Sequence, residues 1–446
     1  MPAASCRHLD AWGPRMRDIV EKIRTEWLQS RSVPVFRRLC QIRVRLGTDC
    51  SGAEAPVWSL RALQQPFEHV FSCDTNPQVR KFIASNSPSH DHFDDMLSRD
   101  LDAVPDVDVY VCGFPCTPYS ALRSHRTKLF KEPAAKPYFA VLEFLRHRRP
   151  PLAVLENVGG LRRVMGKVLR DLEKLMWYFV IWMMIDSEAL GEPVSRPRCY
   201  FLLVRRDAGI SSDVSEMVEF CKKCLSGASS PVQEHVRTRM LPNDSHEVQS
   251  WLKQAMSRPA REVTGKNLKW LKKHETFRRE HGVQGFRGGG LQGVRSERER
   301  DAFGLQAMAW GKDITVDVSQ SIDRAHARTS GVLPTILPRG VCVVGVLDRP
   351  VLPCEKLLLH GFPLHRMQIP AGVSDADLAS MGGNTMHLHS VGLALLMGIS
   401  LLRDPLPTAL PNRCPDRIAP AQFVSVPDCA HAEQQGLSDG KRRRLG

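Results

Sequence analysis

The chain has 446 residues, and its hydrophobic content of 42% and charged content of 25% exclude a protein that is disordered over most of its length. Its net charge of +14 favours polyanionic partners, nucleic acid before an anionic membrane. The opening residues contain no apolar signal sequence and no apolar run is long enough to span a bilayer, so we expect a protein that is neither secreted nor bound in a membrane.

The first 40 residues are predicted to form a helical extension. Apolar side chains recur there at helical spacing, at Met16, Ile19, Val20, Ile23 and Trp27.

Residues 41–208 predict an α/β fold with a doubly wound, mostly parallel sheet. Short apolar runs alternate with helical stretches, which is typical of a parallel sheet covered by helices on both faces. The apolar runs are "IRVRLGTD", "EHVFSCD", "DVDVYVCGF", "LAVLENV", "WYFVIWMMID" and "CYFLLVRR".

Polar and reactive side chains stand at the ends of four of these runs. They are the segment Asp49 to Gly52, then Asp74, Cys116 and the pair Glu156-Asn157. Ligands bind at the carboxyl ends of the strands in such sheets, so we expect these residues to share one site. A lone cysteine is usually a buried structural residue, but Cys116 lies in a proline-rich turn just after a strand, a suitable place for a nucleophile.

Glu156 ends an apolar strand, where burial favours a proton-donating carboxyl group over a helix-capping acid. Arg196 and Arg198 alternate at the head of the last run, and we expect them to share one face and bind an anionic or carbonyl-bearing ligand.

The second half of the chain predicts a basic insert and a return to the sheet. Residues 209–345 form the insert. Within it, residues 251–300 contain thirteen Lys and Arg but only five Asp and Glu. Residues 346–404 are expected to complete the first lobe. Residues 405–446 read as a disordered tail whose basic run at 441–444 is a weak nuclear signal, so we expect a nuclear protein in a eukaryote and an intracellular one otherwise.

The thirteen cysteines are scattered and odd in number, which favours a reduced protein over a disulfide scaffold. Cys221 and Cys224 form a C-x-x-C pair with no second pair nearby, so we expect no metal site.

Five motifs in order resemble those of the cytosine-5 DNA methyltransferases. They are "GFPCTPYS", "ENVGG", "EPVSRPRCYFLLV", "PCEKLLLHGFP" and "GGNTMHLHSVG", and the resemblance covers roughly residues 42–208 and 330–402. It implies the S-adenosylmethionine-dependent methyltransferase fold, with the basic insert as a smaller target-recognition lobe. The implied activity is methyl transfer from S-adenosylmethionine to carbon 5 of cytosine in DNA.

The resemblance also implies catalytic roles. Cys116 matches the nucleophile that attacks carbon 6 of the base. Glu156 matches the acid that hydrogen-bonds ring N3 and the exocyclic amine, and Arg198, supported by Arg196, matches the arginine that contacts the base carbonyl. The target base would have to be flipped out of double-stranded DNA, with the protein acting as a monomer.

For the cofactor, the resemblance places the backbone of Ser51 and Gly52 near the methionine end of S-adenosylmethionine, and Asp49 in the same motif is a further expected cofactor contact. It places Asp74 at the ribose hydroxyls and Asp95 at the adenine amine, although a simple turn acid is the alternative for Asp95. Asn384 falls in the closing motif.

Some positions depart from the family pattern and indicate a divergent member. Ala53-Glu54-Ala55 stands where the family prefers glycines, Thr117 replaces a glutamine or asparagine, and Val194 replaces a glutamine. Two alternatives stay open, a tRNA cytosine-5 methyltransferase and a catalytically weak DNA-binding relative. A cysteine–histidine hydrolase is disfavoured, since no histidine stands at a suitable strand end.

Overall fold

The computed structural model describes residues 3–32, 37–115, 132–257, 269–285, 291–294, 296–407 and 419–424. The chain divides into two compact units. The sheet unit comprises Ala11–Leu190, Pro197–Ser230 and Leu388–Gly446. The insert unit comprises Met1–Asp10, Gly191–Arg196 and Pro231–His387.

The sheet unit is built on eight strands in the order β11-β6-β7-β5-β4-β1-β2-β3. Only β7 runs antiparallel to its neighbours, so the predicted α/β, mostly parallel sheet is confirmed. The strands are β1 (Val44–Asp49), β2 (Phe67–Cys73), β3 (Asp91–Phe93), β4 (Val109–Cys112), β5 (Leu152–Val158), β6 (Tyr178–Ile185), β7 (Arg198–Arg205) and β11 (Gln422–Val424).

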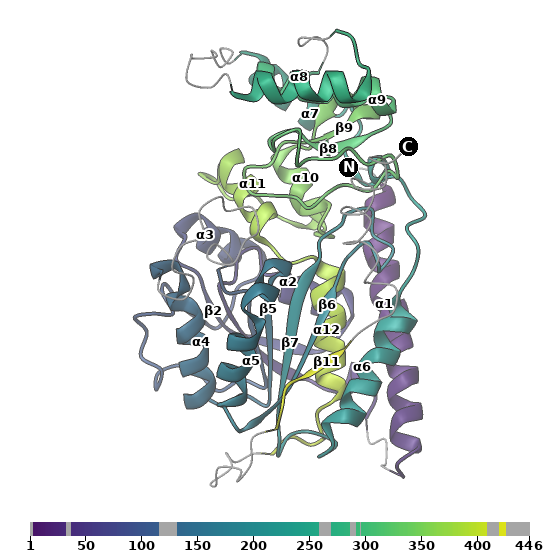
Figure 1. Ribbon diagram of the computed structural model, residues 1–446. Helices are drawn as coiled ribbons and strands as arrows, with labels where there is room; N and C mark the ends of the chain where they lie inside the picture. The colour runs from purple at the N-terminus through teal and green to yellow at the C-terminus, as the bar shows by residue number, and fades with distance from the viewer. Residues whose placement is uncertain are drawn as a thin grey trace. The chain divides into compact units, whose positions relative to one another are not determined.

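Helices cover both faces of this sheet, as Figure 1 shows. Its α-helices are α1 (Ala3–Gln29), which begins in the other unit, α2 (Ala55–Ala62), α3 (Pro77–Asn86), α4 (Lys136–His147), α5 (Met165–Glu173), α6 (Val214–Ala228) and α12 (Leu388–Ser400). The apolar faces of α4 and α5 pack on Tyr110, Leu155 and Phe201 of the sheet. The opposite face receives α12, whose Gly398 lies directly against Leu152.

The insert unit has a three-stranded sheet of its own, in the order β10-β9-β8. It contains β8 (Thr315–Asp317), β9 (Cys342–Val344) and β10 (Arg349–Pro350), with α7 (His246–Ser257), α8 (Lys269–His281), α9 (Glu297–Trp310), α10 (Pro353–Leu358) and α11 (Asp375–Asn384). Its apolar clusters join segments far apart in sequence, as where Val194 packs with Val236 and Val351.

The two compact units do not coincide with the domain boundaries expected from the sequence. Helix α6, within the expected insert, contacts β6 and β11 and belongs to the sheet unit. Residues 346–387, within the expected return segment, belong to the insert unit because Val351 and Leu359 lie in its core. The residues Gln422–Val424 of the expected disordered tail form strand β11, parallel to β6. The ring of Phe423 is tilted against that of Trp182, with the ring centroids 4.2 Å apart.

Candidate active site

Glu156 and Arg198 meet on neighbouring strands of the sheet unit. The antiparallel register of β5 and β7 sets Val158 opposite Arg198, so Glu156 and Arg198 are diagonal neighbours on one face. Arg198 Nε lies 3.1 Å from Glu156 Oε1, and each side chain is only 10% exposed. Glu156 caps no helix, because the following 3-10 helix has Val158 as its N-cap. The register of β5 and β7 therefore brings Glu156 and Arg198 into contact.

Asn157 joins the end of β5 to the segment after β4 by a hydrogen bond. Its side-chain Nδ2 donates to the Phe114 carbonyl at 2.8 Å, and its Oδ1 accepts from the Val158 amide at 2.9 Å. The Asn157 side chain is fully buried, and its hydrogen bond to Phe114 is shielded from water. Phe114 precedes Cys116 by two residues, and Cys116 itself lies outside the described residues. The sequence placed Asn157 at this strand end together with Glu156, but it did not predict the contact with Phe114.

The turn after β1 is held by Ser51. Its Oγ accepts from the Cys73 amide at 3.0 Å, while the Ser51 amide donates to the Cys73 carbonyl at 3.1 Å. Cys50, Gly52 and Glu54 all have positive φ, at 51°, 55° and 58°. The chain therefore winds tightly between β1 and α2, with its backbone fixed to the end of β2.

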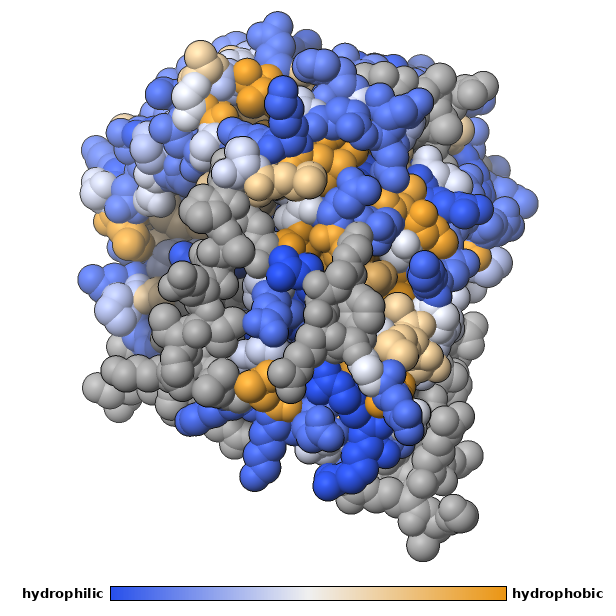
Figure 2. Space-filling model, turned by 90° about the horizontal axis from the view of Figure 1, so that it is seen from above, coloured by the Kyte–Doolittle hydropathy of each residue, from blue (hydrophilic) through white to orange (hydrophobic). Residues whose placement is uncertain are grey.

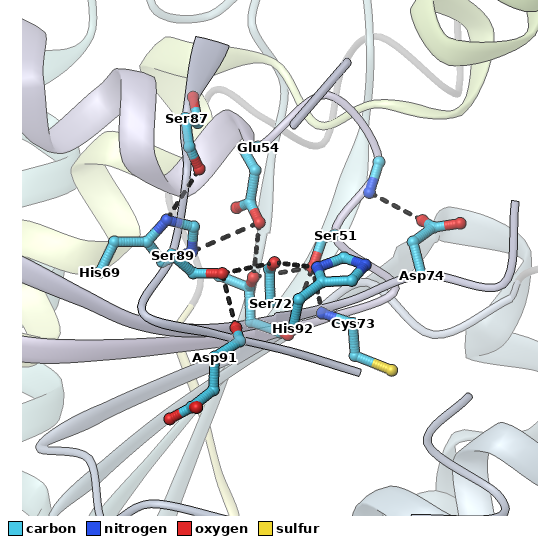
Figure 3. Close-up of polar contacts among 12 residues, drawn as sticks. Ser51, Glu54, His69, Ser72, Cys73, Asp74, Ser87, Ser89, Asp91 and His92 are labelled. Carbon is cyan, nitrogen blue, oxygen red and sulfur yellow. Dashed lines mark hydrogen bonds and ion pairs between the residues drawn. The ribbon is translucent and has the colours of Figure 1, made fainter. Parts of the chain in front are cut away.

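Asp74, just past β2, holds the same turn from the other side. Its Oδ2 accepts from the Gly52 amide at 3.0 Å and its Oδ1 from the Asn76 amide at 2.9 Å. Figure 3 shows this carboxylate beside the turn. Burial raises the pKa of Asp74, and the backbone hydrogen bonds oppose that effect only in part. Ser51, Gly52 and Asp74 are thus brought together as the sequence predicted.

Asp49 is engaged differently from the expected cofactor contact. Its two carboxylate oxygens receive the guanidinium of Arg99, with one N–O distance of 2.6 Å, and Tyr110 Oη donates to Asp49 at 2.7 Å. Burial alone would lower the pKa of Arg99, but the Asp49 carboxylate raises it above its ordinary value. Asp49 is therefore a structural anchor between β1, β4 and the segment after β3, and Arg99 is a partner that sequence analysis missed.

The remaining predicted residues lie in three other settings. Asp95 Oδ1 accepts from the Leu97 amide at 2.9 Å, which is a turn arrangement. Arg196 does not share a strand face with Arg198, because β7 begins only at Arg198. Within the insert unit its guanidinium donates to carbonyls of residues 336, 383 and 385. Asn384 ends α11 and is exposed there.

Cys221 and Cys224 lie side by side on the buried face of α6, where burial raises the pKa of both thiols. No group of three or more His, Cys, Asp or Glu suited to a metal ion occurs within the described part of the chain. None of the helices in that part is both long and apolar enough to cross a bilayer.

Comparison with known proteins gives a consistent picture. The sequence model of the C-5 cytosine-specific DNA methylase family matches residues 50–386. DNA (cytosine-5-)-methyltransferase DMT5 of Cryptococcus neoformans var. grubii is 22% identical over 422 residues, which cover 83% of this chain but only 17% of that protein. Type II methyltransferase M.DsaV of Dactylococcopsis salina is 30% identical over 152 residues, covering 31% of this chain and 41% of the enzyme.

Among solved structures, the Dnmt2 methyltransferase of S. pombe matches with a TM-score of 0.50 at 15% identity. The match covers 79% of this chain and 98% of that one. At this identity the likeness concerns the fold, and it agrees with the methyltransferase-type sheet described above.

Proposed function

Since the chain belongs to the C-5 cytosine-specific DNA methylase family, we propose that it transfers a methyl group from S-adenosylmethionine to carbon 5 of cytosine in double-stranded DNA. The observation that supports this best is the buried Glu156–Arg198 pair, 3.1 Å apart at the end of β5. The next residue, Asn157, fixes the segment that leads to Cys116. An acid, an arginine and a thiol are the groups that this reaction requires of the protein.

In the proposed reaction the Cys116 thiolate adds to carbon 6 of a flipped cytosine, and the electron pair of the 5,6 double bond moves toward carbon 5. Glu156 hydrogen-bonds ring N3 and the exocyclic amine, which draws electron density out of the ring and favours this addition. Arg198 contacts the base carbonyl and orients Glu156. Loss of the carbon 5 proton later restores the double bond and expels the thiolate.

S-adenosylmethionine, when bound, supplies the methyl group. Ser51, Gly52 and Asp74 fit this cofactor, because a carboxylate beside a positive-φ glycine turn offers both hydroxyl acceptors and close backbone approach. A Cβ at Gly52 would have only the Cys50 carbonyl within 4 Å. Asp95 at the adenine amine and Asn384 in the closing motif are further proposed cofactor contacts. We assign Asp49 and Arg196 supporting roles, since each already binds other groups of the protein.

The insert unit is proposed to bind the DNA backbone as a target-recognition region, with one protein molecule on each site. Helix α8 presents Lys269, Lys272 and Arg279 on an exposed face. Lysine and arginine bind phosphates irrespective of base sequence. Figure 2 shows that the face of the molecule seen from above is mostly hydrophilic, with hydrophobic residues in smaller groups.

Methyl transfer to purified substrates tests this proposal. The protein is incubated with tritium-labelled S-adenosylmethionine and either duplex DNA or tRNA, and the DNA is then sequenced after bisulfite treatment. We expect label in the DNA and protected cytosines. Label confined to tRNA would reassign the substrate, and no label in either would refute the enzymatic function.

A further inference from the structure

Glu54 occupies an unfavourable position at the start of α2. Its backbone is left-handed, with φ 58° and ψ 49°, a conformation that glycine adopts without strain and glutamate does not. Its side chain is also fully buried, which is costly for a carboxylate without partners. Glycine would avoid both costs, so the contacts of the Glu54 side chain must compensate for them.

The nearest charged partner of Glu54 is His69 on β2. Glu54 Oε1 lies 3.4 Å from His69 Nε2, and the imidazole is only 6% exposed. His69 Nδ1 lies 3.0 Å from the Ser87 carbonyl, and a carbonyl can only accept, so Nδ1 carries a hydrogen. The other ring nitrogen therefore faces the carboxylate and completes an ion pair when it is protonated.

From Glu54 a directed chain of hydrogen bonds leads to the turn after β1. Thr48 Oγ1 donates its only hydrogen to Glu54 Oε1 at 2.8 Å. Ser51 is then the donor at the 2.8 Å contact between the two hydroxyls, and the Thr48 carbonyl at 3.2 Å is the longer, alternative acceptor for the same hydrogen. Ser51 Oγ in turn accepts from the Cys73 amide at 3.0 Å. Figure 3 shows Glu54 lying between His69 and Ser51, with the end of β2 beneath.

We propose that Glu54 and His69 form a buried positioning pair that holds the Ser51–Gly52 turn in the shape required to bind the cofactor. This inference rests on the proposed function for the identity of the cofactor. Glu54 and His69 touch neither the base nor the reacting atoms. They act by fixing the direction of the Thr48 and Ser51 hydroxyls, and through them the backbone next to Gly52.

Two substitutions separate positioning from simple backbone strain. Glu54→Gly removes the carboxylate and relieves the left-handed backbone, whereas Glu54→Gln removes the charge and keeps an oxygen that accepts from Thr48. The control is Glu68→Gln on the same strand as His69. Glu68 is a partly exposed carboxylate 3.4 Å from His90 and 3.9 Å from Arg43, and it has no link to the turn.

Two measurements are made on each full-length protein. Calorimetric titration gives the dissociation constant of S-adenosylmethionine, and hydrogen–deuterium exchange without cofactor reports on residues 48–56. We expect Glu54→Gly to bind about tenfold more weakly, Glu54→Gln to be intermediate and Glu68→Gln to match the wild type. Exchange in the turn should rise in the same order.

Wild-type affinity and wild-type exchange in Glu54→Gly would overturn the positioning role, since relief of backbone strain would then account for the site. If the wild-type protein itself failed to bind S-adenosylmethionine, the proposed function would fall. The exchange measurement would still decide whether Glu54 orders the turn.

Discussion

At Glu156 and Arg198, two charged groups are withdrawn from water together, each with 10% of its side chain exposed. Removing one partner of such a pair leaves the other buried and unpaired, which costs about 3–5 kcal/mol in typical proteins. Arg198 has an additional acceptor in the Pro197 carbonyl at 2.8 Å. A substitution that keeps an acceptor oxygen at position 156 therefore tests chemistry with the least disturbance of packing.

We predict that Glu156→Gln slows methyl transfer by about 100-fold, because the amide is a poorer partner for ring N3 and the exocyclic amine. The thermal midpoint should change little. Single-turnover methylation of duplex DNA measures the rate, with the exposed Glu143→Gln as control. A rate within a few-fold of the wild type would mean that Glu156 serves only to neutralise Arg198.

Asn157→Ala should lower the free energy of unfolding by about 1–3 kcal/mol, because it removes the buried hydrogen bond from Asn157 to the Phe114 carbonyl. It should also reduce kcat more than it changes KM, since Phe114 leads to Cys116. The matched control is Asn86→Ala, which removes a similar buried amide that donates to the Phe82 carbonyl in α3. Equal losses of kcat in the two variants would contradict a role for Asn157 in holding the nucleophile segment.

At the scale of secondary structure, apolar runs predicted six of the strands closely, because long buried strands need continuous apolar sequence. Two three-residue strands of the sheet unit were not predicted. β3 is largely exposed and polar, and β11 lies in a proline-rich segment, where Phe423 contacts Trp182 and Val424 is buried. The sequence also failed to predict where β7 begins. The spacing of the two arginines in "SRPRC" suggested that both lie on the strand, whereas the strand begins only at Arg198.

The Glu54–His69 pair should make stability depend on pH. Burial lowers the pKa of His69, but the Glu54 carboxylate raises it, and the net result lies above its ordinary value. Its contribution is therefore fully present below the unfolded pKa of about 6.5 and is lost as pH rises through the folded pKa. Arg61 and Asp74, the other charged groups coupled to Glu54, are unchanged by substitution at His69.

We accordingly predict that His69→Gln lowers the thermal midpoint most between about pH 5 and 6.5, and progressively less toward pH 8. Thermal melts at half-unit pH steps measure this, with Glu68→Gln as control. A deficit that is constant with pH, or that grows toward alkaline pH, would contradict the ion pair.

At the scale of the whole molecule, the residues of the site come from distant parts of the chain, and the sequence predicted that they converge because the carboxyl ends of parallel strands share one edge. What the sequence could not provide was which acids already had partners. Asp49 looked like a ligand-binding residue, yet Arg99, fifty positions away, binds both of its oxygens. The position of Cys116 stays a prediction, because the described residues end just before it.

Basic charge on the insert unit should govern binding to DNA. On α8 the buried side is fixed through His274 and Arg278, which both bind the fully buried Asp301, and this leaves Lys269, Lys272 and Arg279 exposed. Replacing those three with glutamine should lower the slope of log affinity against log salt by about 2–3. Titrations of duplex DNA at several salt concentrations measure the slope, and an unchanged slope would exclude α8 from the phosphate contacts.

The most direct test of the account is covalent trapping. Duplex DNA carrying 5-fluorocytosine is incubated with the protein and S-adenosylmethionine, and the product is digested and analysed by mass spectrometry. Fluorine at carbon 5 cannot leave as a proton does, so the account predicts a stable adduct on the peptide that contains Cys116, and none in Cys116→Ser. An adduct on a different cysteine, or no adduct from a protein that binds both DNA and cofactor, would contradict it.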